Sequence, residues 1–231
     1  MEQLVLDLAA PEPPSFANFV PGPNAEALGV LARFAAGAVA ETGVVVWGAA
    51  GSGKTHLLHA AVAAALAAGR SAIYVADHGV LTATEAEVLA RHELVAVDSV
   101  DAANADAQGK LFSVFNALRA RGRNLLAASS APPAALPLRE DVRTRLGWGL
   151  VFEILPLADS DKPAALVAWA QQRGFGLSDD VIRYLLAHGR RDMASLLATL
   201  AALDRHSLAT KRAITVPLLR DWIQRDFRLE R

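Results

Sequence analysis

One eight-residue stretch of the sequence has the residue types and the spacing that are needed to hold phosphate groups. The pattern G-x-x-x-x-G-K-S/T is matched at every fixed position by Gly48-Ala49-Ala50-Gly51-Ser52-Gly53-Lys54-Thr55. The glycines let backbone N–H groups turn inward around an anion, the lysine can reach the β- and γ-phosphates, and the threonine hydroxyl can bind Mg²⁺. The stretch therefore predicts a site for a nucleoside di- or triphosphate. A glycine-rich turn that holds no ligand is the alternative.

A second group suited to metal chemistry is the carboxylate of Asp98. It follows the entirely apolar run Leu94–Val97, about 40 residues after the phosphate-binding pattern. A buried strand of this kind can deliver one carboxylate beside the metal ion of a bound nucleotide, although many apolar strands end in aspartate without such a role. The next residue is Ser99, where many ATPases have a second acid that polarises the attacking water. Because serine cannot do this, we expect weak or no ATP hydrolysis by this chain alone.

Short apolar segments alternate with helical segments over the first two thirds of the chain. The phosphate-binding pattern lies between a strand predicted over Val44–Trp47 and a helix predicted from about Lys54 to Ala68. The other predicted strands are Ser71–Val75, Leu94–Val97, Asn124–Ala128 and Leu150–Leu155, and the other predicted helices are Ala25–Ala40, Gln108–Arg121 and a short one near Val142–Arg145. This alternation is typical of an α/β fold with a parallel sheet, here of five strands.

After Pro156 the signals for strands stop. Helical segments follow over Ser160–Arg173, Ser178–His188, Asp192–His206 and Thr215–Phe227. We therefore expect three parts: an N-terminal tail over residues 1–14, a nucleotide-binding α/β base over 15–155, and an all-helical unit over 156–231.

The composition excludes several classes of protein. Hydrophobic residues make up 53% and charged residues 20% of the 231 residues, as in globular proteins. The net charge of −1 argues against a large basic surface for nucleic acid, and the lack of cysteine excludes disulfides and thiolate metal sites. We find neither a signal peptide nor an apolar run long enough to span a membrane, so the expected location is the cytoplasm.

The order of these motifs resembles that of the AAA+ ATPases, and among them the DnaA-like proteins. The resemblance covers nearly the whole chain. The matching segments are Phe16–Asn24, Trp47–His59, Leu125–Pro133, Arg145–Gly149 and Gly189–Met193. It implies an AAA+ base with a five-stranded parallel sheet, a C-terminal helical lid, and ADP or ATP with Mg²⁺ as the ligand.

The resemblance also implies roles for single residues. Phe19 and Val20 belong to a motif that packs near the adenine, and His56 follows the phosphate-binding loop. Ser130 stands at the sensor 1 position and Arg191 at sensor 2, and both belong to the expected nucleotide site. Arg145 stands at the position of the arginine finger. Since it precedes the last strand beside Trp148, we expect it to be an exposed donor in a turn, with Arg143 as a mere structural neighbour.

Near its N-terminus the chain resembles a peptide that binds the DNA polymerase sliding clamp. The residues at the expected positions are Gln3, Leu4, Leu6 and Leu8. The glutamine amide would bond at the rim of a pocket while the leucines fill an apolar groove; a frayed terminus is the alternative. The sequence also stops at Arg231, where the DnaA initiator would continue into its DNA-binding domain. Both features favour a shortened regulator of the Hda type over the initiator itself.

Three positions depart from the initiator on the hydrolytic side of the site. They are Ser99, Ser130 where aspartate is expected, and Ala131 where arginine is common. The resemblance therefore implies an ADP-bound regulator that docks on the DNA-loaded sliding clamp and presents Arg145 to the ATP of DnaA. Hydrolysis of that ATP would prevent re-initiation. A homodimer is a further possible assembly. The alternatives are a helicase-loader-type AAA+ ATPase that acts with the replicative helicase, an initiator-like DNA-binding protein, and a small-molecule P-loop kinase.

Overall fold

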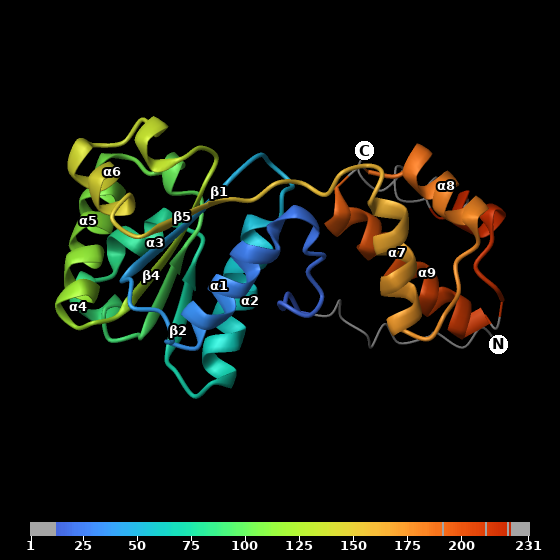
Figure 1. Ribbon diagram of the computed structural model, residues 1–231, viewed down its shortest axis with the longest axis horizontal. Helices are drawn as coiled ribbons and strands as arrows, with labels where there is room; N and C mark the ends of the chain where they lie inside the picture. Colours follow the sequence, from blue (N-terminus) through green and yellow to red (C-terminus); the bar gives the residue numbers. More distant parts are fainter. Residues whose placement is uncertain (1–12, 191, 211, 221, 223–231) are drawn as a thin grey trace. The chain divides into compact units, whose positions relative to one another are not determined.

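The computed structural model describes residues 13–190, 192–210, 212–220 and 222 of the chain. Contacts divide the chain into two compact units, one over Pro14–Pro156 and the other containing the residues from Leu157 onward. The first is an α/β unit and the second is built from helices (Figure 1).

The first unit is organised around a sheet of five parallel strands. They are β1 (Gly43–Trp47), β2 (Ala72–Val75), β3 (Leu94–Val97), β4 (Asn124–Ser129) and β5 (Leu150–Glu153), in the spatial order β2-β3-β4-β1-β5. The register places Ala127 of β4 opposite both Val45 and Val97. Every residue of β3 and β4 is buried, which is the burial expected for a parallel sheet covered on both faces. The predicted five-stranded fold class is confirmed.

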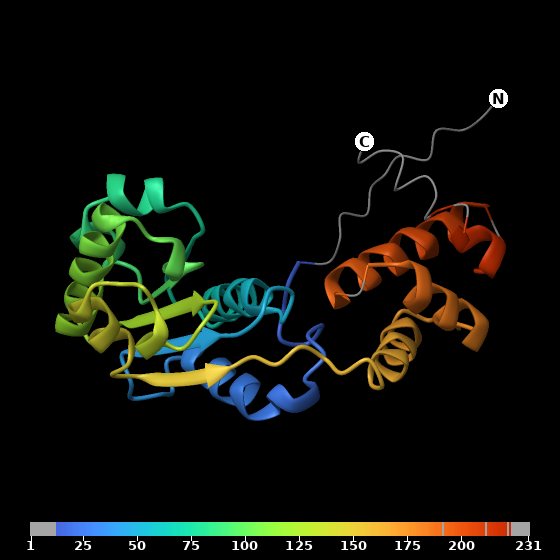
Figure 2. The same ribbon diagram turned by 90° about the horizontal axis from the view of Figure 1, so that it is seen from above.

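Helices cover both faces of this sheet (Figures 1 and 2). They are α1 (Ala25–Ala35), α2 (Lys54–Ala67), α3 (His78–Ala83), α4 (Ala86–Leu89), α5 (Ala105–Ala120) and α6 (Glu140–Leu146). Because successive side chains of a strand point to opposite faces, Val46 packs in one core with α1 and α2 while Val45 packs in the other with α3 to α6. The sheet is thus held between two separate apolar layers.

The local chemistry explains where the helix boundaries differ from those predicted. The first helix ends at Ala35 rather than Ala40, shortly before Gly37, whose φ of +76° is left-handed. Helix α5 begins earlier than predicted because the side chain of Asn104 accepts a hydrogen bond from the N–H of Ala107 at 2.9 Å. Helices α3 and α4 have six and four residues, too few for their apolar spacing to be recognised in the sequence.

The second unit has a core of its own. Its helices are α7 (Lys162–Gln172), α8 (Asp179–His188) and α9 (Met193–Thr210), and residues 216–220 are also helical. Ser178 caps α8, as the sequence predicts, by accepting a hydrogen bond from the N–H of Val181. The core includes Leu166, Trp169, Leu185, Leu200 and Leu219. In the described part of the chain, no helix combines the length and the apolar character needed to cross a membrane.

Candidate functional site

The phosphate-binding pattern forms the turn between β1 and α2, where only glycine fits at two positions. Gly48 has φ of +154° and Gly53 has φ of +101°, a region that side chains with a Cβ rarely adopt. A Cβ on Gly48 would lie 2.3 Å from the carbonyl oxygen of Ile154, and one on Gly53 would lie 2.6 Å from the ring of Phe19. The turn therefore packs closely against Ile154 and Phe19, and it leads into the N-terminus of α2, where backbone N–H groups can hold a phosphate.

Lys54 begins α2 and folds back across this loop. Its Nζ donates hydrogen bonds to the carbonyl oxygens of Gly48 at 2.8 Å and Ala49 at 2.9 Å. Burial lowers the pKa of Lys54 from its ordinary value, although the negative charges of Asp98 and Asp101 act in the opposite direction. A partly desolvated ammonium group bonded to neutral carbonyls is stabilised further by an anion.

The buried hydroxyl of Ser52 supports the same interpretation. Ser52 is 5% exposed, and its Oγ has no hydrogen-bond partner among the described residues. A buried hydroxyl without a partner is costly, and a bound ion or water molecule would satisfy it. The loop residues present thus fit a phosphate group.

Thr55 and Asp98, which the sequence predicts as a metal-binding pair, meet in the structure. Thr55 Oγ1 donates a hydrogen bond to Oδ2 of Asp98 at 2.7 Å, and the aspartate is only 6% exposed. Oxygen groups of this kind suit Mg²⁺. Within the part of the chain that the structure describes, no cluster of three or more His, Asp or Glu side chains could hold a metal ion. A Mg²⁺ ion at Thr55 and Asp98 would therefore take its remaining ligands from phosphate and water.

Tyr74 is a member of the site that sequence reasoning missed. Its hydroxyl donates a hydrogen bond to Oδ2 of Asp98 at 2.9 Å, and its ring centroid lies 3.9 Å from that of His59. Burial, the hydrogen bond to Asp98 and the charge of Asp98 together raise the pKa of Tyr74 to about 12. The sequence offers one signal for this contact. Tyr74 lies near the end of one predicted strand and Asp98 follows another, and in a parallel sheet both strands end at the same edge.

The segment from Ser15 to Phe19 packs over the start of α2. Nε2 of His56 lies 2.9 Å from the carbonyl oxygen of Ser15, and the ring centroids of His56 and Phe19 are 5.5 Å apart. Val20, the next residue, is half-buried. Burial lowers the pKa of His56; the hydrogen bond to Ser15 opposes this effect, and the nearby His59 adds to it.

The lowered pKa of His56 makes a prediction for stability. Because the unfolded state takes up a proton near the ordinary value of 6.5 and the folded state only below it, the free energy of unfolding falls as the pH drops through this window. Wild-type protein should therefore lose more stability between about pH 7.5 and about pH 5.5 than His56→Gln, which has no titrating ring. Urea unfolding at the two pH values measures both losses, and equal losses would contradict the prediction.

Ser130, the predicted sensor 1 residue, lies just beyond β4 and binds an acid. Its Oγ donates to Oδ2 of Asp101 at 2.7 Å, and its N–H donates to Oδ1 of the same residue at 3.2 Å. The charge of Asp101 also raises the pKa of Lys54 against the effect of burial. A carboxylate therefore lies at the end of β4, and it is supplied by Asp101 in the segment that follows β3.

The expectation that Arg145 is an exposed donor in a turn is wrong. It lies in the last turn of α6 and is half-buried. Its Nε donates to Oδ1 of Asn116 at 2.9 Å, Nη1 donates to the carbonyl oxygen of Asp141 at 3.1 Å, and the guanidinium lies 3.9 Å from the ring centroid of Phe112. The helix continues to Leu146, so Arg145 faces α5. Arg143 is also half-buried, on the same helix.

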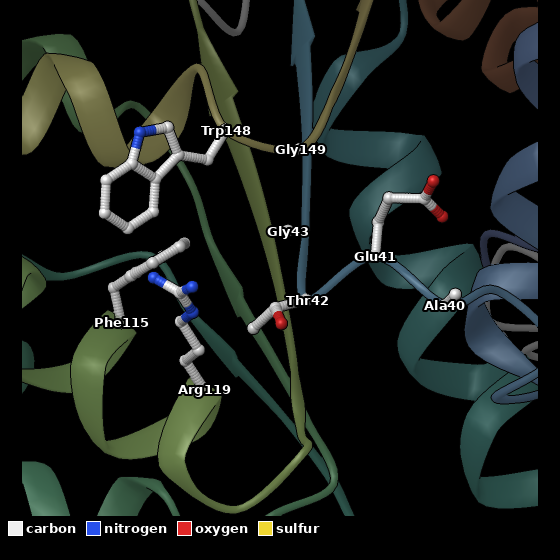
Figure 3. A pocket seen from close by; sticks show the side chains of 8 residues that line it. All are labelled: Ala40, Glu41, Thr42, Gly43, Phe115, Arg119, Trp148 and Gly149. Atoms are coloured by element: carbon white, nitrogen blue, oxygen red, sulfur yellow. The ribbon is translucent and has the colours of Figure 1, made fainter.

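A cavity of about 360 Å³ is lined by Phe115 and Arg119 of α5 and by Trp148, which follows α6 (Figure 3). Trp148, which is 52% exposed, and Phe115 form an aromatic wall with their ring centroids 6.1 Å apart. The guanidinium groups of Arg119 and Arg145 lie 4.8 Å and 5.3 Å from the Trp148 ring. Gly43, the first residue of β1, lines the cavity, whereas the phosphate-binding loop follows the last residue of β1. It is therefore at the opposite end of the strand from the phosphate site.

Several predicted site residues lie outside the described residues. They are Gln3, Leu4, Leu6, Leu8 and Arg191.

Comparison with known families matches the two units separately. A family model of the bacterial DnaA ATPase domain matches residues 12–153, and a family model described as the lid domain of Hda matches residues 159–223. The two matches follow one another with only a short interval, as the α/β unit and the helical unit do.

Solved structures share the fold at low sequence identity. Domain III of DnaA from Thermotoga maritima is 19% identical, with a TM-score of 0.75, over 93% of this chain and 99% of that one. AMPPCP-bound DnaA from Aquifex aeolicus is 22% identical, with a TM-score of 0.70, over 84% of this chain and 66% of that one. A RuvB mutant from Thermotoga maritima is 15% identical, with a TM-score of 0.64, over 92% of this chain and 72% of that one. The chain thus spans about two thirds of the Aquifex protein, and these likenesses establish its fold.

Proposed function

The chain belongs to the bacterial DnaA ATPase-domain family, and on this ground we propose that it is an ADP-bound regulator that inactivates the replication initiator DnaA. In this proposal the chain docks on the DNA-loaded sliding clamp through its N-terminal residues. It then presents an arginine finger to the ATP bound by DnaA and stimulates its hydrolysis, which prevents re-initiation.

The observation that carries the proposal is the presence of two family matches in one chain. The base matches the ATPase domain of the initiator, but the helical unit matches the lid of Hda. The resemblance of the N-terminal residues to a clamp-binding peptide supports the same function.

The geometry of the phosphate loop supports a nucleotide ligand. Lys54 is partly desolvated and donates to two carbonyl oxygens, the buried hydroxyl of Ser52 has no partner among the described residues, and Thr55 is bonded to Asp98. Thr55 and Asp98 would hold the Mg²⁺ of a bound nucleotide, which would neutralise phosphate charge there. Ser99, after β3, has no carboxylate to polarise water, which suits a protein that keeps its nucleotide.

In the proposal, Arg145 has to exchange its present hydrogen-bond acceptor for the phosphate of a partner. An arginine finger spreads its donors over phosphate oxygens as negative charge develops on them. Arg145 donates instead to Asn116 and stacks on Phe112. In the proposal, the phosphates of the partner's ATP replace the neutral amide of Asn116 as the acceptor, because a charged acceptor forms the stronger hydrogen bond.

The test is phosphate release from ATP-loaded DnaA, measured with clamp-loaded DNA and increasing amounts of this chain. The proposal requires faster release that depends on both the clamp and the chain. Hydrolysis of ATP by this chain in the absence of DnaA, stimulated by the replicative helicase or single-stranded DNA, would instead indicate the helicase-loader alternative. The observation that favours that alternative is the carboxylate of Asp101, which accepts a hydrogen bond from the hydroxyl of Ser130.

Clamp docking gives a prediction that is independent of nucleotide. Replacing Gln3, Leu4 and Leu6 together by alanine should abolish binding to the clamp, because the pocket loses its rim hydrogen bond and its apolar anchors. Thermal stability and ADP binding should not change, since Pro11, Pro13 and Pro14 separate the peptide from the base in sequence. Co-elution with the clamp in gel filtration is the measurement.

The control for the clamp experiment is Leu66→Ala, which removes a leucine that is 54% exposed on α2. This variant should bind the clamp like wild type. A triple variant that still co-elutes with the clamp would remove residues 1–8 from the proposal.

A further inference from the structure

Neither the phosphate-binding pattern nor the resemblance gives a role to Tyr74, yet its hydroxyl reaches the buried carboxylate beside that loop. The bond from Tyr74 Oη to Asp98 Oδ2 is 2.9 Å long. The tyrosine comes from β2 and the aspartate follows β3, the neighbouring strand. The contact is therefore set by the sheet and is not local in sequence.

The hydrogen bonds around Asp98 leave its carboxylate fully engaged. An ionised carboxylate has about four lone-pair positions for donors. Oδ2 accepts from Thr55 at 2.7 Å as well as from Tyr74, while Oδ1 accepts from the N–H of Ser99 at 2.8 Å and from its hydroxyl at 3.3 Å. Asp98 is also only 6% exposed. A further donor, such as water bound to a metal ion, can reach this carboxylate only if one of these donors leaves.

The donors differ in how readily they coexist with a metal ion. The hydroxyl of Thr55 can direct a lone pair at Mg²⁺ while its hydrogen still points at Asp98. The N–H of Ser99 belongs to the backbone, where φ of +51° holds it beside the carboxylate. Tyr74 comes from β2, outside the phosphate-binding loop, and its hydroxyl donates to Oδ2, so a metal-bound water would compete with Tyr74 for this oxygen.

We propose that Tyr74 is a positioning residue that lowers the Mg²⁺ dependence of nucleotide binding by this chain. By occupying Oδ2 of Asp98, it weakens the acceptor that would otherwise hold a water of the metal ion. The nucleotide is then retained by the loop and Lys54. The inference rests on the proposed nucleotide function and specifies which cofactor form the site retains.

The experiment is calorimetric titration of ADP into wild type and Tyr74→Phe, in EDTA and again in excess Mg²⁺. Phenylalanine keeps the ring beside His59, whose centroid is 3.9 Å away, and removes only the hydroxyl. We expect Mg²⁺ to change the Kd of wild type by less than about threefold, and to tighten binding by the variant roughly tenfold, the effect of one hydrogen bond to a charged group. In EDTA the two proteins should bind ADP alike.

Two further variants keep the result interpretable. Tyr184→Phe removes the other tyrosine hydroxyl of the chain, on α8, and should behave like wild type. Tyr74→Leu also lacks the hydroxyl and should show the magnesium dependence of Tyr74→Phe; circular dichroism identifies whichever variant is folded.

The outcomes separate this inference from the proposed function. An equal or smaller effect of Mg²⁺ in the folded Tyr74 variants overturns the inference and leaves nucleotide binding intact. Failure of wild type to bind ADP in either buffer overturns the proposed function, and the inference with it.

Discussion

Arg145→Ala is expected to fold and to bind ADP and the clamp like wild type, yet to fail in stimulating ATP hydrolysis by DnaA. An arginine finger supplied by a partner contributes about 10³ to 10⁵ in rate in GTPases, and we expect a loss of roughly 10²-fold or more here because DnaA brings sensors of its own. The physical reason is that alanine has no permanently charged donor to place at the developing phosphate charge. Phosphate release from ATP-loaded DnaA at saturating clamp is the measurement.

Two substitutions sharpen this experiment. Arg145→Lys should fail nearly as badly, because an ammonium group is a point charge and cannot reproduce the fork of a guanidinium. Arg143→Ala is the matched control, since Arg143 is a half-buried arginine on the same helix, and it should retain most of the stimulation. Full stimulation by Arg145→Ala would show that its bonds to Asn116 and Asp141 serve structure alone.

Lys54→Ala should bind ADP and ATP far more weakly than wild type. The variant loses a charge-assisted contact to phosphate worth about 2 to 3 kcal/mol, which corresponds to a Kd higher by about 30- to 150-fold. The fold should survive, because among the described residues Nζ bonds only to the carbonyl oxygens of Gly48 and Ala49 within the same loop. Calorimetry gives both affinities.

Lys110→Ala on α5 is the control for Lys54, because it removes one lysine charge outside the phosphate loop. It should leave ADP affinity unchanged. Identical ADP affinities of Lys54→Ala and wild type would contradict the assignment of the loop as a nucleotide site. They would also remove the basis for a nucleotide-dependent regulator.

Much of the fold was predictable because its signals are local. The apolar run of β3 could be recognised in the sequence at its observed bounds, and β1, β2 and β4 within one residue at one end. The phosphate loop was predictable for a similar reason, since the backbone angles of Gly48 and Gly53 admit glycine and few other residues. Helices α3 and α4 were not predictable, because a few residues contain too little periodicity.

The sequence by itself determined the α/β alternation, the phosphate loop and the choice of Thr55 and Asp98 as candidate metal ligands, because steric limits and buried strand ends act over a few residues. Only the tertiary structure decided that Tyr74 binds Asp98, that Asp101 binds Ser130 and that Arg145 faces Asn116. The first two contacts depend on which strands are neighbours and in what register they pair. The third depends on how far α6 extends and how it is rotated against α5. These quantities are set by the packing of the two apolar layers as a whole, and no short segment of sequence specifies them.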